Sequence, residues 1–217
     1  MSESLVSEPL SDSLPRPLVI ACAALTADLR GVLSASGLGD AVDVHYLPAQ
    51  LHNTPQHIVA NLRPLIEAAT LDGRPVFVAY ADCGTGGRLD AMLADFPEVR
   101  RLPGAHCYEF FAGATLFHDL HEQAIGTFYL TDFLAKHFDA LVWSGLGLDR
   151  APQLRDTYFA NYTRLVLLAQ TEDPDITTKA ATAAVRLGLA FERHFVGRGG
   201  LGTAIADWSM THTPVKL

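Results

Sequence analysis

The three cysteines of the chain lie in segments whose other residues could take part in chemistry. Cys83 follows Asp82 and precedes a glycine-rich turn in "YADCGTGG", and Cys107 follows His106 in "GAHCYEFFAG". Cys22 ends the apolar segment "PLVIAC". Free cysteine is often an ordinary buried apolar residue, but the polar neighbours of Cys83 and Cys107 are unusual for a core position. The pattern therefore predicts a functional site whose thiols bind a metal or attack a substrate.

A metal site is the first interpretation of this pattern. Three thiolates can hold a zinc ion, and His52, His106 or a water molecule would complete the tetrahedron. Three thiolates can also hold an iron centre or a [4Fe–4S] cluster with one unligated iron, although four cysteines are the usual complement. Because zinc accepts mixed cysteine and histidine ligands, we place zinc ahead of iron. The spacing Cys-x60-Cys-x23-Cys is not an established metal motif, and the predicted ligands are Cys22, Cys83, Cys107 and His52.

Ionisable and glycine residues beside the thiols supply the other candidate site residues. We expect Glu109, Asp82 and His106 to move protons at the site. In the glycine-rich turn, Gly84 and Gly86 would let the backbone approach a bound cofactor.

Covalent catalysis by a cysteine, without a metal, is the alternative. Cys83 or Cys107 would attack an electrophile if a nearby histidine or a helix N-terminus lowered the pKa of its thiol. Cys83 stands just before a predicted helix, whose dipole favours a thiolate. The chain has no diagnostic Cys/His/Asn spacing, so we rank this alternative second.

Composition excludes several classes of function. The chain has 217 residues and a net charge of −8, and its 16 Lys and Arg residues form no basic stripe. Nucleic-acid binding is disfavoured, because neutralising phosphates requires clustered cations. No apolar segment approaches the 18 residues of a membrane-spanning helix. The acidic residues 1–16 lack a basic start and read as a flexible leader, and the odd cysteine count indicates a reducing, cytoplasmic location.

Alternating strands and helices place these residues on an α/β fold. Apolar segments and turn signals predict strands at 17–22, 42–48, 75–83, 98–102, 139–147, 164–170 and 190–197. Helices are predicted at 24–37, 51–70, 86–96, 108–120, 126–138, 153–162, 173–188 and 201–208. We expect a mainly parallel sheet with helices on both faces, a Rossmann-like three-layer arrangement, in a single domain over 17–217.

In such a sheet the cysteines share one edge. Cys22 ends the first predicted strand, Cys83 ends the third, and Cys107 lies just past the fourth. His52 follows the second strand by a few residues. Open parallel sheets bind their ligands outside the carboxyl ends of the strands. We therefore expect all these side chains to meet in one crevice.

Several ungapped segments resemble a known family. They are "IACAAL", "LPAQLHNTP", "YADCGTGGRLD", "GAHCYEFFAG", "GTFYLTDFL" and "GLGLDRAPQLRDTYFANYTRLVLLAQ", spread over about residues 17–201. Together they are similar to the domain-of-unknown-function family 1638. The resemblance implies a context of corrinoid-dependent methyltransferases and one-carbon metabolism. The motif positions that match are Cys22, His52, Asn53, Asp82, Cys83, Gly84, His106, Cys107 and Glu109, and we add Asn53 to the candidate cofactor-binding residues.

The combined expectation is a metal-dependent cytoplasmic enzyme that acts on a small molecule in one-carbon or methyl-group chemistry. The alternative outside enzymology is an accessory protein that handles a metal or a corrinoid. The partners that fit are a small-molecule substrate and a corrinoid protein or methyltransferase, with no nucleic acid and no membrane. The sequence leaves a homo-oligomer open.

Overall fold

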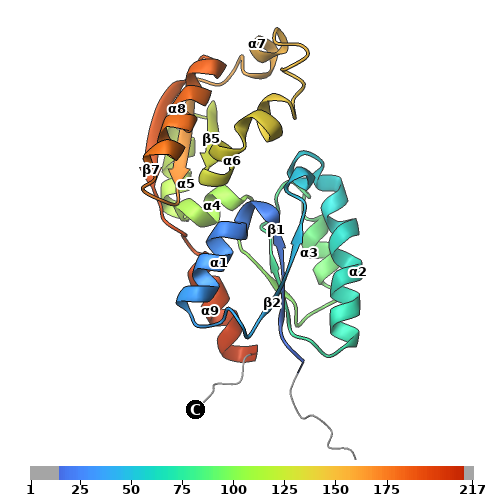
Figure 1. Cartoon of the computed structure of the whole chain (residues 1–217). Coiled ribbons are helices and arrows are strands. Elements are labelled where there is room, and N and C mark those ends of the chain that lie inside the picture. Colours follow the sequence, from blue (N-terminus) through green and yellow to red (C-terminus); the bar gives the residue numbers. More distant parts are fainter. Residues whose placement is uncertain (1–14, 213–217) are drawn as a thin grey trace, which may run out of the picture.

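Two parallel β-sheets covered by helices make up the described part of the chain, residues 15–212 of a computed structural model (Figure 1). The expected leader, residues 1–16, lies outside the described residues except for its last two positions. In the part that is described, no helix combines the length and the apolar character needed to cross a membrane.

The first sheet has the strand order β2-β1-β3-β4, with every pair parallel. Its strands are β1 (Leu18–Cys22), β2 (Asp43–Leu47), β3 (Val76–Ala79) and the short β4 (Arg100–Arg101). The central strands β1 and β3 are apolar almost throughout, as expected for strands that are covered on both faces.

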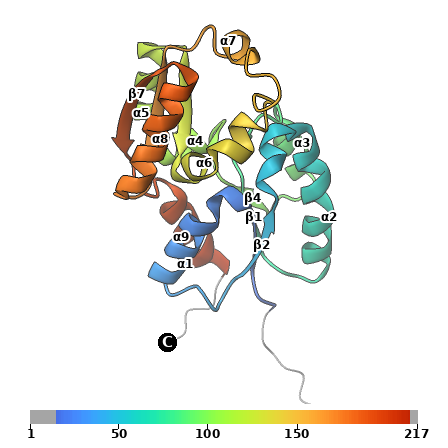
Figure 2. The same cartoon turned by 45° about the horizontal axis from the view of Figure 1, so that its top comes forward.

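Helices cover both faces of this sheet (Figures 1 and 2). Val19 and Ala21 of β1 pack toward α1 and α9, whereas Leu18 and Ile20 pack toward α2 and α3. We call this sheet and its helices the first half. The helices are α1 (Thr26–Ala35), α2 (Ile58–Leu71), α3 (Arg88–Leu93) and α9 (Leu201–His212), with short 3-10 turns η1 (Ala23–Leu25), η2 (Ala49–Asn53) and η3 (Pro55–His57).

The second half is built in the same way around a smaller sheet with the order β5-β6-β7. Leu165 and Leu167 pack toward α6 and α8, and Val166 and Leu168 pack toward α4 and α5. The strands are β5 (Thr127–Thr131), β6 (Arg164–Ala169) and β7 (Ala190–Phe195). The other elements are α4 (Cys107–Ala112), α5 (Ala114–Gln123), α6 (Asp132–Lys136), the π-helical turn η4 (Asp139–Trp143), α7 (Leu154–Tyr158) and α8 (Pro174–Leu187).

The chain passes between the halves twice, and the two passages touch. The first passage runs through α4, and the second returns from β7 to α9, which packs in the core of the first half. At the contact, the amide of Gly200 donates a hydrogen bond to the carbonyl of Phe110, 2.9 Å away. A Cβ on Gly199 would lie 2.4 Å from the same carbonyl oxygen, so only glycine fits there.

The predicted fold class is confirmed, since both sheets are parallel and flanked by helices on two faces. Several local predictions were wrong. The strand predicted over 75–83 ends at Ala79, so Cys83 lies in the turn after β3 rather than at the end of the strand. Residues 126–138 hold β5 and α6 instead of one helix, and residues 139–147 hold η4 and turns instead of a strand. The predicted helix at 108–120 breaks at Gly113, whose φ of +80° ends α4. The single domain over 17–217 stays a prediction.

Candidate functional site

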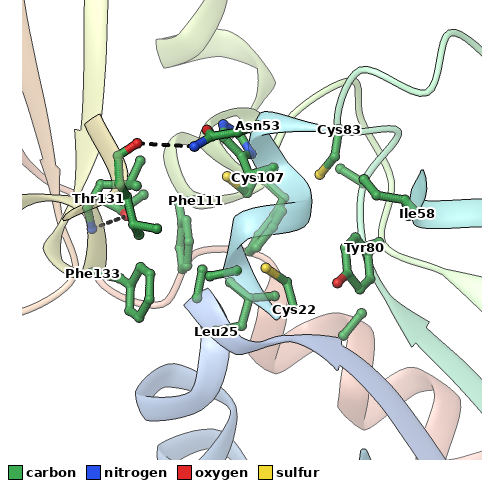
Figure 3. Close-up of a pocket in the computed structure, with 18 residues that line it drawn as sticks. Cys22, Leu25, Asn53, Ile58, Tyr80, Cys83, Cys107, Phe111, Thr131 and Phe133 are labelled. Carbon is green, nitrogen blue, oxygen red and sulfur yellow. Dashed lines mark hydrogen bonds between the residues drawn. The ribbon is translucent and has the colours of Figure 1, made fainter. Parts of the chain in front are cut away.

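One cavity lies where the carboxyl edge of the first sheet faces the second half (Figure 3). The centres of water-sized molecules can occupy about 50 Å³ of this cavity. All the empty space in it, including space that is open to solvent, is about 710 Å³. A water molecule needs about 10–15 Å³ of such centre volume, so the enclosed part suits a ligand of a few heavy atoms. The cavity is lined by Cys22, Ala24, Leu25, Ala49, His52, Asn53, Ile58, Ala79, Tyr80, Ala81, Cys83, Cys107, Phe110, Phe111, Thr131, Phe133, Leu134 and Leu141.

All three cysteines line this cavity, although they come from distant segments (Figure 3). Cys22 is the last residue of β1, and Cys107 is the first residue of α4. The amides of Asp82 and Cys83 donate to the carbonyls of Gly104 and Ala105, at 3.1 and 2.8 Å. These two bonds hold the segment after β3 against the segment before α4, which brings two cysteines together.

The backbone at Cys83 is strained. Its φ is +49°, and it is the only non-glycine residue in the described chain with a positive φ. Such a conformation costs on the order of 1–3 kcal/mol and persists where the surrounding structure enforces it, which is frequent at functional sites. The turn thus holds the Cys83 thiol at the cavity, although its backbone conformation is strained.

The thiols share an environment that favours their neutral form. Burial raises the pKa of Cys22, and it raises the pKa of Cys83 to about 12, with a further increase from the neighbouring Cys22. Burial also raises the pKa of Cys107 well above its ordinary value, and Cys83 and Cys22 add to the effect. Cys83 and Cys107 therefore respond to the charge of a neighbouring thiol, and the environment of all three disfavours the thiolate unless a cation binds among them.

His52 and Asn53, at the end of η2, line the same cavity. Although His52 keeps part of its surface open to solvent, the partial burial of the imidazole lowers its pKa, and the neighbouring His106 lowers it further. A neutral imidazole is the form that binds metals. The side-chain amide of Asn53 donates to the carbonyl of Leu141 at 3.2 Å, which joins the first half to the second across the cavity.

The turn that carries Cys83 contains Asp82, Gly84 and Gly86. None of these three residues lines the cavity. The Asp82 carboxylate accepts hydrogen bonds from the Thr85 hydroxyl and from the amides of Gly86 and Gly87, at 3.0 and 2.9 Å for the amides. Burial opposes ionisation of Asp82, but these hydrogen bonds hold its pKa below the ordinary value. The observed role of Asp82 is to fix the turn, and proton transfer by this residue stays a prediction.

His106 and Glu109 are also placed beside the cavity rather than in its wall. Glu109 accepts a hydrogen bond from the amide of Ala105 at 2.9 Å, and its carboxylate lies against Gly104. His106 immediately precedes α4, and its ring centroid is 6.5 Å from that of Tyr108. Both residues therefore shape the loop that carries Cys107, and their predicted acid–base roles stay predictions.

Tyr80 is a cavity residue that sequence reasoning missed. It follows β3 directly and is only 3% exposed, and its hydroxyl points toward the side of the cavity where Cys22 lies (Figure 3). The hydroxyl lies beside the Cys22 thiol, a weak acceptor, and no described residue accepts a hydrogen bond of regular geometry from it. Burial raises its pKa, and the nearby Cys22 raises it further, so the hydroxyl is a neutral donor. A polar-tipped residue at the end of an otherwise apolar strand was the available signal.

The second half contributes mainly apolar side chains to the cavity. Phe133, Leu134 and Leu141 come from α6 and η4 and face the thiols. Thr131, at the end of β5, caps α6 by accepting a hydrogen bond from the amide of Leu134 at 3.3 Å. This half therefore closes the cavity and adds Cys107 from α4, while the first half supplies Cys22, Cys83 and His52.

The three thiols and the His52 imidazole are ligands that suit a soft metal. Their side chains are not already arranged around one ion. Among residues 15–212, no group of three or more His, Cys, Asp or Glu side chains is arranged to hold a metal ion. In a zinc site each sulfur lies about 2.3 Å from the metal. Binding would therefore require the thiols to turn toward a common centre.

Comparison with known proteins gives a family and nothing beyond it. A family model described as "Protein of unknown function (DUF1638)" matches residues 46–205. The match includes His52, Cys83 and Cys107 and begins after Cys22. No curated protein matches the chain, and no solved structure matches it. Since the matched residues make up well over half of the sequence, this chain belongs to the DUF1638 family.

Proposed function

We propose that this protein is a metal-dependent enzyme that acts on a small molecule in the cavity between its halves. Cys22, Cys83 and Cys107 would hold zinc or, as the second choice, an iron or iron–sulfur centre, and His52 would be the fourth ligand. The observation that carries the proposal is that every cysteine of the chain lines one cavity, although the three lie far apart in sequence.

The electrostatics of the cavity support a bound cation. Burial raises the pKa of all three thiols, so the protein alone lacks the positive charge that thiolates would need. A bound metal supplies that charge, and metal binding then releases the thiol protons. We propose that the thiols rotate toward the metal as it binds, while the strained turn at Cys83 limits how far the backbone must move.

The same pKa shifts weigh against a metal-free cysteine nucleophile. The thiolate is the attacking species, and reactive cysteines usually have a pKa below the ordinary value. Here burial raises the pKa of Cys83 to about 12, and it also raises the pKa of Cys107 well above its ordinary value. We therefore keep the nucleophile as the less favoured alternative.

A substrate would reach the metal by displacing His52 or as a fifth ligand. The metal would then act as a Lewis acid that polarises the substrate or lowers the pKa of its thiol. Asp82 and Glu109 fix the loops that carry two of the ligands, so we assign these two residues first to positioning. His106 stays a candidate for proton transfer. One-carbon or methyl-group chemistry, with a corrinoid protein or methyltransferase as partner, rests on the family resemblance. The three cysteines are free of disulfides, which agrees with a reducing compartment such as the cytoplasm.

Metal analysis tests this proposal. The protein is purified without oxygen, its metals are quantified, and its UV–visible spectrum is recorded. A colourless protein with about one zinc supports the tetrahedral site, and a brown protein that absorbs near 400 nm supports an iron–sulfur cluster.

Cysteine variants complete the test. We expect Cys83→Ser and Cys107→Ser to lose most of the metal. Ala81→Ser is the matched control, because Ala81 lines the same cavity and its substitution keeps every thiol. Full metal content in both cysteine variants would contradict the metal site and favour the nucleophile. Metal that binds and passes readily to an acceptor, without turnover of small thiols or methyl donors, would favour the accessory protein.

A further inference from the structure

An unpartnered hydrogen-bond donor lies in the wall of the cavity. The Tyr80 side chain is buried and lines the cavity, and its hydroxyl lies beside the Cys22 thiol, a weak hydrogen-bond acceptor. No described residue accepts a hydrogen bond of regular geometry from this hydroxyl. Leaving a buried hydroxyl without a partner costs about 1–3 kcal/mol. A bound molecule with an acceptor atom would remove that cost.

Two other polar groups, on opposite sides of the cavity, each have one hydrogen-bond partner. The Asn53 amide donates to the carbonyl of Leu141, and the Thr131 hydroxyl accepts from the amide of Leu134. These bonds stabilise the wall, and of the two hydroxyls in the cavity lining, Tyr80 is the one without a regular hydrogen bond to a described residue.

In the described part of the chain, the rest of the wall has no charged side chain to pair with a charged ligand. None of the described residues that line the cavity is Asp, Glu, Lys or Arg, and most are aliphatic or aromatic. Phe110, Phe111 and Phe133 give it an extended aromatic surface. Burying an ion without a charged partner is costly, so a carboxylate or a phosphate is poorly matched to this surface. An apolar group gains free energy from the same burial.

Deepening the function proposed above, we propose that the cavity binds a small uncharged molecule with an apolar body and one acceptor atom, which receives the hydrogen bond of Tyr80. The enclosed volume limits the body to a few heavy atoms. The acceptor lies on the Cys22 side of the cavity, toward which the Tyr80 hydroxyl points (Figure 3), so it sits close to the thiols.

Probe molecules of matched size test this inference. Tetrahydrofuran carries one acceptor oxygen, cyclopentane has nearly the same shape without it, and acetate is small but charged. Each is titrated into the full-length protein, as purified, while the amide NMR signals of the cavity residues are followed. We expect tetrahydrofuran to bind more tightly than cyclopentane and acetate not to bind. Equal binding of tetrahydrofuran and cyclopentane, or preferential binding of acetate, would overturn the inference.

Two tyrosine variants assign the hydrogen bond. Tyr80→Phe should weaken tetrahydrofuran binding by about three- to tenfold and leave cyclopentane binding unchanged, as expected for one lost hydrogen bond. Tyr129→Phe is the matched control, because the Tyr129 hydroxyl is also buried without a regular partner but lies in the core of the second half, outside the cavity lining. Equal losses in both variants would contradict a specific role for Tyr80.

Metal content, measured on the same samples, separates this inference from the proposed function. A protein that discriminates between the probes but contains no metal supports the ligand class and contradicts the metalloenzyme. A protein that binds metal but treats the probes alike supports the metal site and overturns the ligand class.

Discussion

The two halves of the molecule have similar layers, but the polar groups at the edges that face each other differ. In the second half they bond to one another, and in the first half they line a cavity. At the carboxyl end of β5, the carboxylate of Asp132 accepts hydrogen bonds from the amides of Gln170 and Thr171, at 3.0 and 2.9 Å, and from the Thr171 hydroxyl at 2.6 Å. The side chain of Gln170 in turn accepts from the amide of Asp132 at 2.7 Å. These groups satisfy one another.

At the corresponding edge of the first half, polar groups instead gather around empty space. The thiols of Cys22 and Cys83, the His52 imidazole and the Tyr80 hydroxyl, which has no regular hydrogen bond to a described residue, line the cavity, and Cys107 of α4 completes the set of thiols. Polar groups that satisfy each other stabilise an edge, whereas polar groups left around a cavity are available to a ligand. The difference teaches that strand topology alone does not make a site, because both sheets present a carboxyl edge and only one of them keeps its donors open.

The largest expected effect concerns the passage that joins the halves. Gly199 has a φ of +50°, and an added Cβ would lie 2.4 Å from the Phe110 carbonyl oxygen. We expect Gly199→Ala to lower the free energy of unfolding by about 3 kcal/mol, from backbone strain and the clash together. Gly197→Ala is the control, because φ is +61° but nothing lies within 4 Å, so about 1 kcal/mol is expected. Urea denaturation measures both, and equal losses would mean that the crossing is not tightly packed.

A smaller effect tests the charge that the first half presents to the second. Burial raises the pKa of Asp28 to about 6, Arg198 opposes the increase, and Asp132 of the second half adds to it. Between pH 4 and 6 the folded protein therefore binds more protons than the unfolded chain, so stability falls as pH rises through this window. We expect this group to cost at most about 3 kcal/mol by pH 7.

Asp28→Asn should remove that loss, so the variant gains stability over the wild type as pH rises from 4 to 7. Urea denaturation at pH 4.5 and pH 7 measures the difference. The exposed Asp119→Asn on α5 is the control and should follow the wild-type slope. Parallel stability curves for the wild type and Asp28→Asn would show that Asp28 is not desolvated between the halves.

The smallest effect concerns the direct bond across the cavity. Asn53→Ala removes the 3.2 Å hydrogen bond to the Leu141 carbonyl, and we expect a loss of about 0.5–1 kcal/mol together with faster dissociation of tetrahydrofuran. Asn61→Ala removes a 2.8 Å bond to His57 within the first half and should change stability without changing dissociation. Identical dissociation rates in both variants, measured by NMR line shapes, would show that the Asn53 bond does not hold the cavity closed.

Much of the first half could be predicted from sequence. Its central strands are short apolar segments that end at a cysteine or a glycine-rich turn, and the carboxyl-edge rule then placed Cys22, Cys83 and Cys107 together. The strand-by-strand order, and the division into two sheets, depend on long-range pairing that no local pattern encodes.

The second half shows why local patterns failed. In "TFYLTDFLAK", β5 runs into α6 with no loop between them, and the apolar residues fit a helical spacing across the junction. Strand formation there depends on pairing with β6, because β-propensity is set by neighbouring strands. Thr131 was the available signal, since a threonine N-cap marks the start of a helix rather than its middle. The missing partner of Tyr80 could be recognised only once the cavity was assembled.

The return of the chain to its starting sheet has a consequence for synthesis on the ribosome. Leu201, Ile205 and Trp208 of α9 belong to the same core as Val19 and Ala21 of β1. The second half has all its strands once β7 has emerged, but the first half waits for the last helix of the described chain. The core of the half that is made first is therefore completed only after the whole second half and α9 have been made.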